Sequence, residues 1–438
     1  MKSYGFPIVP RLLTLRQIPK VLRNPIPVIE GNLNRFGDPY GVKVGPKKLN
    51  ILVTRPEIIR HVLQKNHRNY RKSEIQTRQL ASFIGTGILT LEGDDWRRQR
   101  RLVQPGFHKE KIESLSNVIA QTTDDFFKVL LKKGEEKTVN IHSEMMNLAF
   151  LIVSKALLGA QVNTDHIGAL RVSIASSQQV LIKMIRLPFL ESFFHWTGEI
   201  PRTLKQIEKT NAIIQSYIEA KRTEGIGGDD LLTTLMTARY EDTGLPMEEK
   251  QLLYEALVLF VAGHETSANA LTWTLYLLDQ NPDLKSHLID QLAVGDDQYL
   301  KQVIQEALRL YPPAWITDRV TVEEDDLGEI RFPKNSLIVS FIYGAHRHPD
   351  YWSDPDKFDP DRFEPTKVES ITPFSYLPFG GGPRLCIGMQ FAMLEIEIVL
   401  KCFLQSIDFK LMESEKIGVK PLITLNPQGP VKTRVSLR

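Results

Sequence analysis

One cysteine lies in the part of the chain whose residue types are most suited to chemistry. Cys386 stands in the run Phe379-Gly-Gly-Gly-Pro-Arg384-Leu-Cys386-Ile-Gly388, where glycines surround a single thiol. Three roles are open to it: a small buried hydrophobe, a nucleophile paired with a histidine, or a thiolate ligand of a metal. No sequence feature places a histidine beside Cys386, and the run favours presentation of the thiolate to a metal.

A second group of polar residues interrupts a long apolar segment. Helical periodicity runs from Gln251 to Gln280 and ends at Asn281-Pro282, where proline forbids continuation. Inside it, Ala262-Gly263-His264-Glu265-Thr266 combines a helix-weakening glycine with a carboxylate and a hydroxyl. One interpretation is a kink with a threonine that bonds to its own helix. The other is a helix opened where a ligand lies, with Glu265 and Thr266 handling protons.

A third element pairs opposite charges on one helix. Glu306 and Arg309 are three residues apart, which puts them on one helical face, and Pro360-Asp-Arg362-Phe363 follows later. Alone, such a pair means little, because exposed ion pairs are common and weak. Its weight comes from the order of all these elements in one chain.

In that order the elements resemble the cytochrome P450 family of haem-thiolate monooxygenases. The pattern Phe-x-x-Gly-x-Arg-x-Cys-x-Gly is matched without a mismatch and is highly specific. The Glu-x-x-Arg and Trp-x-x-x-Arg elements are weak singly but stand in the expected places. The resemblance covers essentially the whole chain and implies a haem b cofactor, with Cys386 as the axial ligand of its iron.

The resemblance also assigns roles around the haem. Donors to the propionates would be Trp96, Arg100, Arg319 and Arg384, and the other contacts would come from Ala262, Gly263, Phe379, Ile387 and Gly388. Glu306 would be held between Arg309 and Arg362 as a buried structural network. The glycines beside the cysteine would let backbone approach the porphyrin. Cys402 is interpreted as a core residue, and His264 as a structural one.

Glu265 and Thr266 match the acid and alcohol that deliver protons during oxygen activation in this family. The implied reaction inserts one atom of O2 into a C–H bond of a small organic substrate, as a hydroxylation or an oxidative O-demethylation. A separate ferredoxin or flavodoxin, with its NAD(P)H-dependent reductase, would supply the electrons and would dock on the basic stretch that follows Trp96. The alternative is a haem-binding sensor without turnover, which has no need of proton delivery.

Composition limits the other possibilities. The 438 residues contain 55 Lys and Arg against 52 Asp and Glu, a net charge of +3 that does not indicate a nucleic-acid partner. With only two cysteines, a disulfide framework is excluded and a cytoplasmic location is expected. Residues 1–30 contain five prolines and several basic residues, which predicts an irregular segment packed on the domain and no transmembrane segment.

The elements that must position these residues are mainly helical. The segment 251–280 would span about 45 Å and form a buried central helix. Strands are expected in two parts, about 40–60 and 315–345, the second folded about the turn Pro333-Lys-Asn-Ser336. We therefore expect a mainly α fold with minor β, the cytochrome P450 fold, as a single domain over 1–438 that acts as a monomer. The haem would lie between the central helix and the loop and helix that carry the cysteine.

Overall fold

The structure is a computed structural model that describes residues 4–44, 48–131, 135–159, 162–187, 190–224, 227–412 and 416–438. The chain forms two compact units, each assembled from separated segments. The first contains residues 1–73, 297–386 and 418–428, and the second contains 74–296, 387–417 and 429–438. The boundary falls directly after Cys386.

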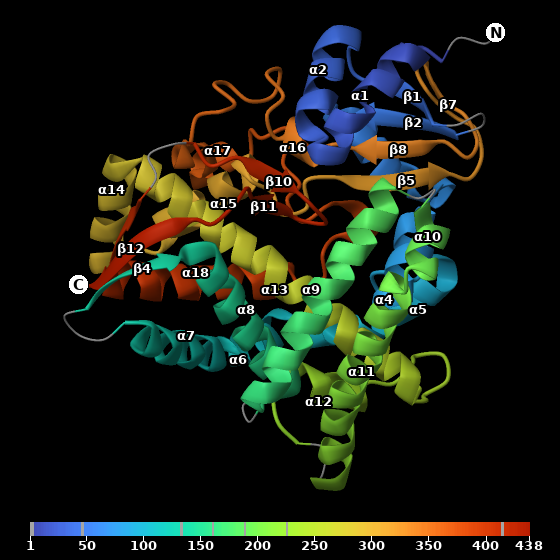
Figure 1. The fold of residues 1–438 in the computed structure, drawn as a ribbon. Coiled ribbons are helices and arrows are strands. Elements are labelled where there is room, and N and C mark those ends of the chain that lie inside the picture. Colours follow the sequence, from blue (N-terminus) through green and yellow to red (C-terminus); the bar gives the residue numbers. More distant parts are fainter. Residues whose placement is uncertain are drawn as a thin grey trace. The chain divides into compact units, whose positions relative to one another are not determined.

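The first unit is built on a five-stranded sheet whose strand order is β1-β2-β8-β5-β3 (Figure 1). β2 and β8 are parallel, and the other neighbours are antiparallel. The strands of the unit are β1 (Tyr40–Val44), β2 (Lys48–Val53), β3 (Tyr70–Arg71), β5 (Thr317–Thr321), β6 (Asp325–Leu327), β7 (Ile330–Phe332), β8 (Leu337–Ser340), β10 (Val419–Pro421) and β11 (Leu425–Pro427). Its helices are α1 (Arg11–Arg23), α2 (Ile26–Phe36), α3 (Pro56–Arg60), α15 (Gln298–Leu310), α16 (Ile342–Ala345) and α17 (Pro365–Val368).

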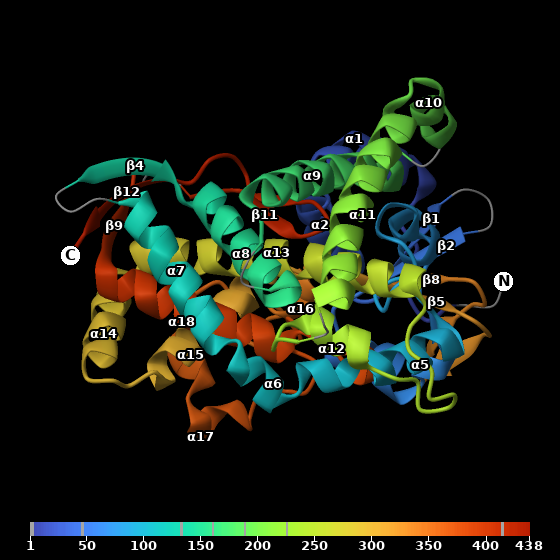
Figure 2. The ribbon, with the colours of Figure 1, turned by 90° about the horizontal axis from the view of Figure 1, so that it is seen from below.

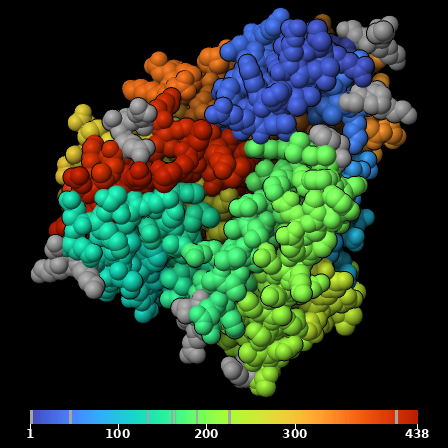
Figure 3. Space-filling model, in the orientation of Figure 1, coloured from blue at the N-terminus to red at the C-terminus, as the bar shows by residue number. Residues whose placement is uncertain are grey.

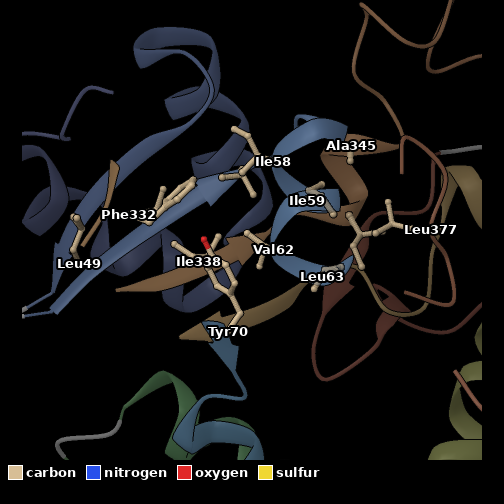
Figure 4. Packing of buried hydrophobic residues seen from close by; sticks show 13 residues of the cluster. Leu49, Ile58, Ile59, Val62, Leu63, Tyr70, Phe332, Ile338, Ala345 and Leu377 are labelled. Atoms are coloured by element: carbon tan, nitrogen blue, oxygen red, sulfur yellow. The ribbon is translucent and has the colours of Figure 1, made fainter. Parts of the chain in front are cut away.

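The core on this sheet is apolar and includes residues from the turn of helix that follows α3. Figure 4 shows Val62 and Leu63 beside Ile338 and Tyr70, which belong to the same buried cluster. Leu63 is important for the site, because its backbone contacts the loop that leads to Cys386.

Helices dominate the second unit. They are α4 (Ala81–Ile84), α5 (Gly93–Val103), α6 (Lys109–Ser114), α7 (Ser116–Leu130), α8 (Ile141–Leu158), α9 (Thr164–Arg186), α10 (Glu191–Trp196), α11 (Glu199–Glu224), α12 (Leu231–Thr237), α13 (Glu249–Gln280), α14 (Pro282–Ala293) and α18 (Met389–Ser406). A three-stranded sheet has the order β4-β12-β9, with bounds β4 (Glu136–Asn140), β9 (Ile407–Leu411) and β12 (Lys432–Leu437). α13 packs on α8 and α18, and α7 packs on α8 and α18 as well (Figure 2).

The central helix predicted from periodicity is confirmed as α13, which ends at Gln280 because Pro282 opens the next helix. The two β-rich parts are also confirmed, although α3 occupies the end of the first. The turn predicted at Pro333–Ser336 is present and separates β7 from β8, which do not pair with each other. β7 pairs with β6 and β8 pairs with β2 and β5, so the turn joins two different sheets.

The expectation of an irregular lead-in was wrong for most of residues 1–30. Pro10 precedes the first residue of α1 and Pro25 precedes that of α2, positions where a missing N–H costs no helical hydrogen bond. The prolines therefore start helices here. Among the described residues one helix, α8, is long and apolar enough to cross a membrane. However, 61% of this helix is buried inside the structure, as is usual for a core helix.

Candidate functional site

The loop that carries Cys386 is held by packing within the first unit. Gly382 has φ +70°, and a Cβ there would lie 1.9 Å from the carbonyl oxygen of Leu63. A Cβ on Gly381 would lie 2.6 Å from the ring of Phe374. Only glycine fits the approach of residue 382 to the Leu63 backbone, whereas a Cβ on Gly381 would require the Phe374 ring to shift, so contacts within the protein favour glycine at both positions. The backbone N–H of Cys386 donates to the Phe379 carbonyl at 3.0 Å, which closes the loop.

The two cysteines differ in their environment. Cys386 is exposed at the end of its loop, whereas Cys402 is half-buried in α18. Burial raises the pKa of the Cys402 thiol, which disfavours its thiolate. The geometry therefore agrees with the interpretation of Cys402 as a packing residue, and it leaves the exposed Cys386 as the thiol that is accessible to a ligand.

The polar stretch of α13 lies in an uninterrupted helix. Thr266 Oγ1 donates to the carbonyl oxygen of Ala262 at 2.9 Å, as in the first of the two interpretations. A Cβ on Gly263 would lie 2.6 Å from Cγ2 of Val153 in α8, so the glycine permits close packing of these two helices. Ala262 is exposed and Thr266 is half-buried, one turn apart on the same face.

Glu265 faces a different neighbour. Its side chain is buried, and Nε2 of Gln178 in α9 donates to its carboxylate at 2.5 Å. Gln178 thus bonds to the Glu265 carboxylate, whereas the hydroxyl of the adjacent Thr266 bonds to the Ala262 carbonyl. His264 is buried, and its Nδ1 lies 3.1 Å from the Phe260 carbonyl. Burial lowers the pKa of His264, which fits the structural role predicted for it.

The structure brings Glu306, Arg309 and Arg362 together. Nε and Nη2 of Arg309 donate to the two carboxylate oxygens of Glu306 at 2.7 and 2.8 Å, and both side chains are fully buried. Nε of Arg362 lies 3.4 Å from the same carboxylate. Burial raises the pKa of Glu306, although the hydrogen bonds from Arg309 oppose the rise.

Arg309 has a second function that the sequence did not indicate. Its Nη1 donates to the carbonyl oxygens of His346 and Pro355, both at 2.7 Å, and Nη2 donates to that of Lys357 at 3.1 Å. One side chain therefore fixes α15 against two irregular segments by donating to their backbone oxygens.

The remaining residues predicted from the resemblance lie on several elements. Trp96 and Arg100 are one turn apart in α5, the first buried and the second half-buried. Arg319 is buried in β5, where its Nη1 donates to the Asp318 carbonyl at 2.6 Å. Arg384 ends a short turn of 3-10 helix before the cysteine. Phe379, Ile387 and Gly388 are each half-buried.

Comparison with known proteins identifies the family. The family model described as Cytochrome P450 matches residues 5–433. The chain belongs to the cytochrome P450 family. The P450 fold predicted from the motifs is thereby confirmed, and the chain is an oxidoreductase of the monooxygenase class with a haem cofactor.

P450 proteins similar to this chain come from several different organisms. Cyclooctatin synthase of Streptomyces melanosporofaciens is 28% identical, over 92% of this chain and 89% of that protein. Echinocystic acid 23-monooxygenase of Saponaria officinalis is 27% identical, over 92% of this chain and 82% of that protein. The structure of retinoic acid bound cyanobacterial CYP120A1 has a TM-score of 0.81 and 22% identity, covering 93% of this chain and 94% of that one, and supports the fold.

The residues present fit a haem-thiolate P450. An exposed thiol stands at the end of a loop that packing holds in place, which is the arrangement a thiolate ligand requires. Ala262 is an exposed small residue in the middle of a helix that is otherwise largely buried, so it leaves one face of α13 open to a flat group.

Two buried acids that sequence reasoning missed support the second unit of this P450. Oε2 of Glu255 accepts from the backbone N–H of Ile88 at 3.1 Å, which ties the loop before α5 to α13. Ser267 Oγ donates to Oε2 of Glu395 in α18 at 2.6 Å. Each pair joins residues more than a hundred positions apart, so no local signal could have revealed it.

The basic stretch after Trp96 is less positive than its sequence suggests. Arg98 pairs with Asp242 at 2.9 Å and Arg101 with Glu241 at 3.9 Å, both in the loop before α13. Lys109 pairs with Glu113 at 3.6 Å. These exposed pairs reduce the local charge that an acidic partner would meet.

Proposed function

We propose that the chain is a haem b monooxygenase that inserts one oxygen atom of O2 into a C–H bond of a small organic substrate. The outcome is a hydroxylation, or an O-demethylation where the carbon adjoins an ether oxygen. A separate ferredoxin or flavodoxin with its NAD(P)H-dependent reductase supplies electrons, and the chain works as a cytoplasmic monomer.

Each of the predicted site residues has its own role in the proposed reaction. The haem, when bound, activates dioxygen for insertion into the C–H bond. Cys386 supplies the thiolate that donates electron density to the iron. Thr266 holds a hydroxyl on the open face of α13, where it exchanges its bond to the Ala262 carbonyl for one to a reacting group. Glu265 accepts and releases protons behind it, and Gln178 orients its carboxylate. Trp96, Arg100, Arg319 and Arg384 are proposed donors to the propionates.

The acid and alcohol of α13 carry the proposal. A sensor that binds a ligand without turnover needs no hydroxyl on the open face of this helix and no carboxylate one residue before it. Glu265 is buried, and a buried acid costs more free energy than an apolar side chain in the same place would, even with Gln178 donating to its carboxylate. That cost is understandable if the acid handles protons.

The first experiment tests ligation. The reduced, CO-bound wild-type protein is expected to show the strongly red-shifted Soret band of thiolate ligation, and the Cys386→His variant is expected to lose that shift while still binding haem. Cys402→Ser serves as the matched control and should retain the band. A wild-type spectrum without the red shift would contradict the assignment of Cys386.

The second experiment separates the monooxygenase from the sensor. Thr266→Ala is expected to lower the yield of product per electron consumed, with O2 diverted to peroxide, and Thr266→Ser should restore coupling. Thr272→Ala is the control, because Thr272 makes the same bond to the carbonyl four residues earlier but is fully buried. Equal coupling in all four proteins would remove the argument for proton delivery and favour the sensor.

The substrate is proposed only as a class. The relative named echinocystic acid 23-monooxygenase acts, by its name, on echinocystic acid. A screen for substrate-induced spectral shifts should therefore include terpenes and steroids, together with fatty acids and methylated sugars.

A further inference from the structure

The most exposed apolar surface in the first unit belongs to α1. Its side chains Leu12, Leu15, Ile18 and Val21 have exposed fractions of 64%, 60%, 45% and 39%, and no residue of the helix is buried. Figure 3 shows the N-terminal segment, in blue, open to solvent over a broad surface. With about 100° of rotation per residue, Leu12, Leu15 and Ile18 form one stripe along the helix.

The orientation of this stripe is fixed by the opposite side of the helix. Gln17 Nε2 donates to Oδ1 of Asn32 in α2 at 2.8 Å, and Asn32 Nδ2 donates back to Oε1 of Gln17 at 3.2 Å. Gln17 lies about 160° around the helix from Leu15. Directly after α1, Asn24 Nδ2 donates to the Val419 carbonyl at 3.3 Å. These bonds hold α1 against its unit and leave the apolar stripe facing outward.

Positive charge lies along the edge of the stripe. Arg16, Lys20 and Arg23 are spaced four and three residues apart, and Arg11 begins the helix. The helix contains no acidic residue, so its charge of +4 exceeds the +3 of the whole chain. Among the residues that the structure describes, none of these four cations forms an ion pair.

We propose that α1 is a docking surface for an anionic lipid bilayer. An interfacial helix lies in the plane of the membrane with its apolar side chains among the acyl chains and its Lys and Arg side chains at anionic headgroups. α1 has both features: Arg16 and Arg23 lie next to Leu12 at one edge of the stripe, and the exposed Lys20 lies farther around the helix. At 13 residues it is too short to span a bilayer, which needs about 20, so the association is peripheral.

A second copy of the chain is a poorer occupant of this surface. Two α1 stripes facing each other would bring two sets of four positive charges together without an acidic residue on either helix. Like charges at an interface are unfavourable, whereas an anionic headgroup layer neutralises them. The proposal concerns where the enzyme is placed and is independent of the reaction proposed above.

The experiment measures sedimentation of the haem-loaded full chain with lipid vesicles. Wild-type protein should pellet with phosphatidylcholine vesicles that contain about a third phosphatidylserine, and much less with phosphatidylcholine alone. Raising the salt from about 0.1 M to about 1 M shortens the Debye length from ~10 to ~3 Å and should release most of the bound protein.

Two double variants divide the contributions of apolar contact and charge. The double variant Leu15→Ser with Ile18→Ser should have a vesicle partition coefficient at least about tenfold lower than the wild type, because two apolar side chains no longer enter the acyl region. Arg16→Gln with Lys20→Gln should weaken it about 25-fold, roughly fivefold for each charge, and should reduce the salt dependence.

Matched controls remove similar groups elsewhere. Val129→Ser with Val172→Ser removes two exposed apolar side chains from α7 and α9. Lys205→Gln with Lys209→Gln removes two exposed charges that are also four residues apart, in α11. Both should bind as wild type, and all proteins should keep the wild-type Soret spectrum and melting temperature.

Three results would overturn the proposal. The first is wild-type binding that does not depend on phosphatidylserine, and the second is loss of binding in the controls equal to that in the α1 variants. The third comes from sedimentation velocity without vesicles: a wild-type dimer that Leu15→Ser with Ile18→Ser converts to a monomer would assign the stripe to a second copy.

Discussion

The imidazole of His346 accepts a hydrogen bond from the backbone N–H of Leu377, with 2.8 Å between Nε2 and N. Because this N–H can only donate, Nδ1 carries the imidazole hydrogen and donates to the Arg309 carbonyl at 3.0 Å. One buried side chain therefore joins α15 to the segment that leads into the cysteine loop, two residues before Phe379.

Replacement of His346 by Leu is expected to lower the free energy of unfolding by about 2 to 5 kcal/mol, because a buried N–H and a buried carbonyl each lose a partner. Urea denaturation at neutral pH measures the loss. His67→Leu is the control, since His67 is more exposed and should change stability little. A loss in His346→Leu no larger than in the control would show that the two bonds are dispensable.

The same variant also tests how the free energy of unfolding depends on pH. Burial lowers the pKa of His346 from 6.5 to about 3, so between these values the unfolded chain binds a proton that the folded chain does not. The wild type should therefore lose about 1.4 kcal/mol of stability from this group for each pH unit below 6.5. His346→Leu lacks this slope, and the stability difference between the two proteins should shrink as the pH falls. A constant difference from pH 7 to pH 5 would contradict the assignment.

Glu306→Gln tests the buried network of α15. Its removal leaves Arg309 and Arg362 without their common carboxylate, and the expected loss is about 3 to 5 kcal/mol. Glu113→Gln breaks the exposed pair with Lys109 and should cost at most about 1 kcal/mol. Denaturant unfolding of both variants gives the comparison. Similar small losses would mean that the buried network contributes no more than a surface pair.

Gly263→Ala tests why a glycine stands in the middle of α13. Overpacking against Val153 is expected to cost about 1 to 3 kcal/mol, and a second substitution, Val153→Ala, should recover much of that loss by removing the clashing methyl groups. A double-mutant cycle of unfolding free energies, measured without haem, decides the point. Additive losses would indicate that the glycine is needed for a reason other than the packing of α8.

The sequence predicted those parts of the site that lie within short motifs. Cys386 and its glycines, the acid and alcohol of α13, and the pair Glu306 and Arg309 each lie within ten residues of their motif partners. Helical periodicity was sufficient to find α13, because it remains apolar over many turns. These are local properties of the chain, and local properties can be read directly.

The parts that were missed depend on contacts between distant segments. His346 lies 31 residues from Leu377, Ser267 lies 128 residues from Glu395, and Ile88 lies 167 residues from Glu255. A lone histidine or glutamate carries no sign of such a partner. The reason for Gly382 was also missed, because the atom that excludes a Cβ belongs to Leu63, in a different part of the chain.

Glu395 provides a further test, since its carboxyl group is buried and has one hydrogen-bond partner among the described residues. Oε2 accepts from Ser267, and Oε1 has no hydrogen-bond partner among the described residues. Burial raises the pKa of Glu395 from 4.5 to about 8, so the folded protein keeps this acid protonated at neutral pH. Between those values the folded chain binds a proton that the unfolded chain does not, and stability from this group falls by about 1.4 kcal/mol for each unit of rising pH.

Glu395→Gln is neutral and nearly isosteric, so it should remove this slope. In urea unfolding, the free energy of unfolding of the variant should rise steadily relative to that of the wild type from pH 5 to pH 8. Above that range the difference should stay constant. Ser267→Ala removes the hydrogen bond that lowers the pKa of Glu395 and should extend the slope to higher pH. Infrared absorption of a protonated carboxylic acid at pH 7, absent from Glu395→Gln, gives a direct check. A parallel pH dependence in the wild type and Glu395→Gln would mean that this buried group is ionised in the folded protein.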